Sequence, residues 1–177
     1  EGTQWRVEQA RVWILSDEFR SRYGQIVRSL QENLLVNPED RSSRLLLAAA
    51  HEKAGEFQVA LTMYREALQR WPRDIAVVTR TVQALYNAGE DEEAQEVLER
   101  AMSRDLYDPD FKRLQLTGYL RRSDLASDST VRQEALASAS DILQELVRQD
   151  PNDVQAALKL VSRSEEHTSE LQSLLII

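Results

Sequence analysis

Apolar residues recur at helical spacing along most of the chain, and glycine or proline interrupts them at regular intervals. Apolar side chains return every three to four residues over 45–53 and again over 57–71. Gly55 separates the two segments, and Pro72 follows the second. Glycine ends a helix at little cost because it adopts the left-handed conformation, and proline cannot extend a helix because it lacks the amide hydrogen. The pattern predicts a helix, a tight turn and a second helix.

This plan repeats after 34 residues. The turn and the small residues of the first unit, Ala54-Gly55-Glu56, Ala60 and Ala67, recur in the second unit as Ala88-Gly89-Glu90, Ala94 and Ala101. A fixed period of this length, built on one helix pair, predicts an array in which each pair stacks on the next.

Weaker copies flank the two clear units. We expect a degenerate helix pair in residues 1–40, repeats at 41–74 and 75–108, a degenerate repeat at 109–153 and the start of another at 154–162. Counted from Pro109, the closing proline falls at 151 instead of 140, so the repeat at 109–153 carries 11 extra residues. These fall in the polar stretch 121–132, whose composition is typical of an exposed loop or a helix extension.

The residues at these offsets resemble the tetratricopeptide repeat family. Its pattern of small, aromatic and closing positions is filled in the first unit by Ala48, Gly55, Ala60, Tyr64, Ala67 and Pro72. The second unit has Val82, Gly89, Ala94, Leu98 and Ala101, with Leu106 in place of the proline. The resemblance implies an all-α fold, a right-handed superhelical α-solenoid of antiparallel helix pairs. It also implies that the first helices line a groove that binds another protein or an extended peptide segment.

We expect this groove to be formed by residues on three first helices: Leu45, Ala49, Glu52, Thr79, Arg80, Gln83, Tyr86, Asn87, Arg113 and Thr117. Arg80 and Gln83 can bond carboxylate or backbone groups, and Tyr86 offers a flat apolar ring with a polar tip. A partner segment with acidic and apolar residues would suit this set. One subclass of the family clamps a C-terminal carboxylate with Lys and Asn, but Leu45, Ala49 and Arg80 occupy three of those places.

Composition and charge narrow the classes of function. At 42% apolar residues the chain is too apolar for disorder. A net charge of −8 without a concentrated basic run argues against nucleic acid as a partner. No apolar run is long enough to predict a transmembrane segment. The absence of cysteine excludes disulfides and thiol chemistry, and it leaves both the cytoplasm and the periplasm open.

We expect neither catalysis nor a bound cofactor or metal. His51 occupies a core-facing repeat position and is predicted to be structural. The acidic run 90–93 follows Gly89, where carboxylates stabilise a helix N-terminus, so capping is favoured over calcium binding. The tryptophans are predicted to pack in the interior and not to form a stacking platform: Trp5, Trp13 and Trp71.

The end of the chain breaks the pattern. The stretch 163–173, RSEEHTSELQS, resembles the conceptual translation of a common sequencing adapter, so we expect 163–177 to be a non-native tail. A carboxylate and histidine cluster inside that stretch, Glu165-Glu166-His167, therefore carries no weight. Because the chain begins with Glu1 and not with methionine, we also expect it to be a fragment of a longer protein.

Taken together, the sequence favours a non-catalytic scaffold or adaptor that binds a partner along a solenoid groove. Two alternatives stay open. The repeats could be the substrate-recruiting or regulatory arm of a larger enzyme or of a secretion or assembly protein. They could also form a self-associating structural array. The sequence indicates neither the partner nor the oligomeric state.

Overall fold

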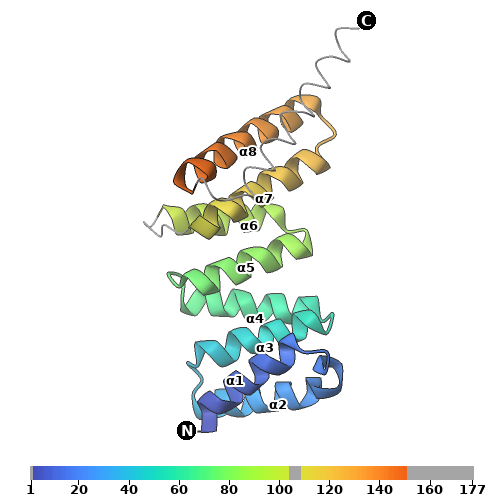
Figure 1. Cartoon of the computed structure of the whole chain (residues 1–177), viewed down its shortest axis with the longest axis vertical. Helices are drawn as coiled ribbons and strands as arrows, with labels where there is room; N and C mark the ends of the chain where they lie inside the picture. The colour runs from blue at the N-terminus through green and yellow to red at the C-terminus, as the bar shows by residue number, and fades with distance from the viewer. Residues whose placement is uncertain (1, 104–108, 151–177) are drawn as a thin grey trace, which may run out of the picture. The chain divides into compact units, whose positions relative to one another are not determined.

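The computed structural model describes residues 2–103 and 109–150, and every element in those ranges is an α-helix (Figure 1). The helices are α1 (Gly2–Leu15), α2 (Phe19–Val36), α3 (Arg41–Lys53), α4 (Phe57–Arg70), α5 (Ile75–Ala88), α6 (Asp91–Met102), α7 (Pro109–Leu125) and α8 (Ser129–Gln149). The all-α fold predicted from the sequence is confirmed. The chain divides into two compact units, Glu1–Leu106 and Tyr107–Ile177, and each is described by itself.

In the first unit, α1 to α6 stack in chain order (Figure 1). Each helix packs on the next one along the chain, and α1 also contacts α3. The first helices of the first two pairs, α1 and α3, therefore lie side by side.

The turns inside the two clear pairs have the same geometry. Gly55 and Gly89 adopt positive φ values of 87° and 79°. The amide of Glu56 donates to the carbonyl of His51 at 2.9 Å, and the amide of Glu90 donates to that of Leu85 at the same distance. A hydrogen bond to the carbonyl five residues back gives a partner to one of the backbone carbonyls that a helix leaves unbonded at its C-terminal end. The chain can form this bond only if one residue of the turn adopts the left-handed conformation, which glycine does without steric strain. The predicted role of both glycines is confirmed.

Helix starts repeat in the same way. Asp40 and Asp74, 34 residues apart, cap α3 and α5, and they accept the amides of Ser43 and Val77 at 3.2 and 3.0 Å. A capping carboxylate at this position compensates amides that have no partner within the helix. The pairs α3–α4 and α5–α6 thus each begin on an aspartate and turn on a glycine.

Small and aromatic repeat positions form the core, as the resemblance implied. Tyr64 and its counterpart Leu98 are buried, and so are the small residues that let the helix axes approach closely: Ala48, Ala60, Ala67, Ala94 and Ala101. Interiors packed at this density leave little room for a change of volume.

The first pair differs from the second by one helical turn. Its second helix, α2, has 18 residues against 14 in α4, and Pro38 and Pro72 follow their ends at the same distance. The extra turn therefore lies at the start of α2, and it shifts α1 relative to the strict period.

A buried polar cluster ties the first pair to the second. Asn33 is fully buried on α2, and its Nδ2 donates to the carbonyl of Thr3 at 2.8 Å and to Oγ of Ser43 at 3.1 Å. Arg6 donates to its Oδ1 at 3.4 Å, and Ser43 donates onward to Asp40 at 2.7 Å. Residues of α1, α2 and α3 are thus joined through one amide, because a buried polar group must find partners. The sequence pattern did not reveal this cluster.

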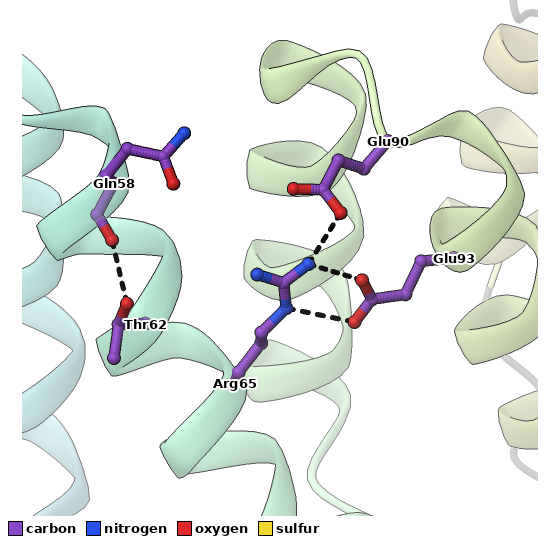
Figure 2. Close-up of polar contacts among 5 residues, drawn as sticks. All are labelled: Gln58, Thr62, Arg65, Glu90 and Glu93. Atoms are coloured by element: carbon purple, nitrogen blue, oxygen red, sulfur yellow. Dashed lines mark hydrogen bonds and ion pairs between the residues drawn. The ribbon is translucent and has the colours of Figure 1, made fainter.

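The acidic start of α6 does more than cap a helix. Asp91, Glu92 and Glu93 occupy its first turn, as predicted. In addition, Arg65 of α4 donates through Nε to Glu93 at 3.0 Å and through Nη2 to Glu90 at 2.7 Å (Figure 2). Hydrogen bonds from this guanidinium lower the pKa of Glu93. One arginine thereby clamps the second helices of two neighbouring pairs.

The equivalent glutamate in the preceding turn makes a different link. Glu56 accepts the hydroxyl of Tyr23 at 2.8 Å and lies 2.6 Å from Nδ1 of His51. The hydrogen bond with His51, followed by that from Tyr23, lowers the pKa of Glu56. Burial and the neighbouring Glu56 raise the pKa of Tyr23 to about 12. His51 thus joins three helical segments, in keeping with its predicted structural role.

The prediction for the tryptophans is wrong for Trp5, which is 62% exposed. Trp13 is partly buried against the core of the first unit, and Arg22 lies 5.3 Å from its ring centroid. Eight residues advance a helix by two turns and about 80°. This offset leaves Trp13 at the edge of the buried stripe and turns Trp5 to solvent. Trp71, which caps the end of α4, is partly buried.

In the second unit, α7 and α8 pack on each other around Leu116, Ala139, Leu143 and Leu146. The polar stretch 121–132 is helical except for residues 126–128, and Asp128 caps α8 through the amide of Thr130 at 2.7 Å. The extra residues therefore lengthen the helices. The predicted segment 154–162 and the tail 163–177 lie outside the described residues.

The Asn33 cluster predicts a strong coupling between two positions. Asn33→Ala removes the partner of Ser43 and should lower the free energy of unfolding by about 1–3 kcal/mol. Adding Ser43→Val creates the Ala and Val pair found one repeat later at Ala67 and Val77, and it should recover part of that loss. Urea unfolding followed by circular dichroism measures both. Strictly additive losses would contradict the coupling.

The Arg65 clamp predicts a dependence of stability on pH. A carboxyl whose pKa is lowered on folding stabilises the fold above its ordinary pKa of 4.5, and that stabilisation is lost as the pH falls through the folded value. Between about pH 5 and about pH 3, the urea concentration at the unfolding midpoint should therefore fall less in Arg65→Gln than in the parent chain. Arg100→Gln, which loses one exposed pair with Glu96, is the matched control. Equal slopes in the two variants would rule out the clamp as the cause.

Candidate functional site

The predicted binding residues of the first unit lie on α3 and α5. On α3, Leu45, Ala49 and Glu52 are partly exposed and share one side of the helix at spacings of four and three residues. On α5, Arg80 and Gln83 are exposed and Thr79 is partly exposed. We define the candidate face as Leu45, Ala49, Thr79, Arg80 and Gln83.

A hydrogen bond shows that these two helices present their predicted residues side by side. Nδ2 of Asn87 on α5 donates to Oε1 of Glu52 on α3 at 3.1 Å. The other oxygen of Glu52 accepts the hydroxyl of Tyr64 at 3.2 Å. The structure therefore brings Glu52 and Asn87 together, and both carboxylate oxygens of Glu52 are engaged. We place these two residues at the end of the candidate face as a link between repeats and leave them out of the ligand-binding set.

Arg80 is the cation of the candidate face. Its side chain is exposed and makes no hydrogen bond or ion pair with any described residue. By contrast, three other arginines of the same helix pairs are engaged, Arg41 by Asp74, Arg44 by Glu66 and Arg65 by α6. The Glu52 carboxylate on α3 accepts hydrogen bonds from Asn87 and Tyr64 and makes no ion pair with Arg80.

The charge of Arg80 on α5 acts on the buried hydroxyl of Tyr64 on α4. Burial and then the Glu52 carboxylate raise the pKa of the Tyr64 hydroxyl, while the charge of Arg80 acts in the opposite direction. The tyrosine therefore remains a neutral donor to Glu52 at physiological pH. Arg80 acts on the Tyr64 hydroxyl through its charge alone, and it makes no bond to Tyr64 or to Glu52.

Tyr86 requires a correction. It was expected to offer an exposed ring, but it is only 3% exposed. Four residues separate it from the buried Val82, so the two side chains lie within about 40° of each other around the helix. Because α5 packs between α4 and α6, its buried stripe is wide enough to include this ring. Tyr86 belongs to the core.

Arg113 and Thr117 lie on α7, in the second unit. Both side chains are exposed. Arg113 forms an ion pair with Asp110 at 2.9 Å, and the hydroxyl of Thr117 donates to the carbonyl of Arg113 at 2.9 Å. A threonine that bonds back to its own helix offers less hydrogen-bonding capacity to a ligand. The candidate face is therefore restricted to α3 and α5.

Clusters of metal-ligating side chains and long apolar helices are both absent from the described residues. Within 2–103 and 109–150, no group of three or more His, Cys, Asp or Glu side chains could hold a metal ion. In that part of the chain, no helix is both long and apolar enough to cross a membrane.

Comparison with known proteins agrees with the helix-pair geometry. A family model described as tetratricopeptide repeat matches residues 52–116. A Pseudomonas aeruginosa pilF structure superposes with a TM-score of 0.68 at 20% identity, over 97% of this chain and 73% of that one. MamA from Desulfovibrio magneticus RS-1 gives 0.63 at 18% identity, over 96% and 92% of the two chains.

A tetratricopeptide repeat protein from Parabacteroides merdae also superposes, with a TM-score of 0.53 at 12% identity over 99% of this chain and 79% of that one. No curated protein sequence matches the chain. At such identities the structural likeness establishes the fold alone. Residues 52–116 thus match the tetratricopeptide repeat, and the solved structures share the all-α fold of this chain.

Proposed function

We propose that this protein is a non-catalytic scaffold that binds an extended segment of a partner protein across the candidate face. Tetratricopeptide arrays generally act in protein interaction, because stacked helix pairs present broad surfaces and carry no chemistry of their own. The observation that carries the finer proposal is Arg80, an exposed guanidinium without a bond to any described residue.

The chemistry of the candidate face specifies the partner segment. Leu45 and Ala49 supply a shallow apolar area on α3, and Thr79 and Gln83 offer hydrogen-bonding groups beside it on α5. A guanidinium presents donors in a planar fork that fits a carboxylate. An extended segment with one acidic side chain followed by small apolar residues satisfies all three requirements. We expect affinity to fall as salt rises, because the arginine is exposed to solvent.

Reversal of one charge tests this proposal. The probes are fluorescein-labelled peptides of eight residues that alternate Asp with Leu or Ala, and matched peptides in which Asn replaces Asp. We expect Arg80→Glu to raise the Kd of the acidic peptides at least about tenfold and to leave the weak binding of the Asn peptides unchanged. Fluorescence anisotropy gives both values.

The control is Arg73→Glu, which makes the same change in net charge. Arg73 is exposed between α4 and α5, bonds to no described residue and lies outside the candidate face. This variant should bind within about twofold of the parent chain. If the two variants lose affinity equally, or if neither does, the candidate face is not the binding site.

A further inference from the structure

We draw no further inference here: the strongest candidate, the surface patch of exposed apolar side chains that Trp5 and Val12 form on α1, carries no proposal because nothing in the described part of the chain shows what covers it.

Discussion

Close approach of helices through small buried residues is the constraint on which the rest of the structure depends. Ala60 and Ala67 on α4, and their copies 34 residues later, are almost without exposed surface. They let neighbouring axes come near enough for one tyrosine or leucine to fill each layer. Because a stack of helix pairs has no single central core, each pair must repeat the same packing of small and large side chains. In α3 and α5 the aspartate cap fixes where the helix begins, and the left-handed glycine fixes where it ends.

Polar contacts between neighbouring helix pairs fix the position of each pair on the next. The Asn33 cluster, the Arg65 clamp and the bond between Glu52 and Asn87 each connect different helix pairs. The bond between Glu52 and Asn87 also bears on the candidate face, since it engages the carboxylate of α3 while Arg80 of α5 bonds to no described residue.

Much of the fold could be predicted from the sequence because helix stops and small residues act locally. The roles of Gly55 and Gly89 in ending a helix, and of Asp40 in starting one, depend only on residues near them in the sequence. Tyr86 and Trp5 could not be placed in the same way. Whether a residue at the edge of a helical stripe is buried depends on the width of the contact made by the adjacent helices, and this width is a tertiary property. Asn33 was missed for the same reason, because an amide within an apolar pattern does not reveal which partners will satisfy it.

The central claim is that the sides of α3 and α5 that carry the candidate face bind a partner segment. Chemical-shift mapping on the ¹⁵N-labelled chain tests this most directly, with an unlabelled peptide of alternating Asp and Leu as the titrant. We predict that the largest shifts fall at the amides of Leu45, Ala49, Arg80 and Gln83 and at the side-chain amide of Gln83. Shifts confined to the outer sides of α4 and α6, or no shifts at peptide concentrations up to about 1 mM, would contradict the claim.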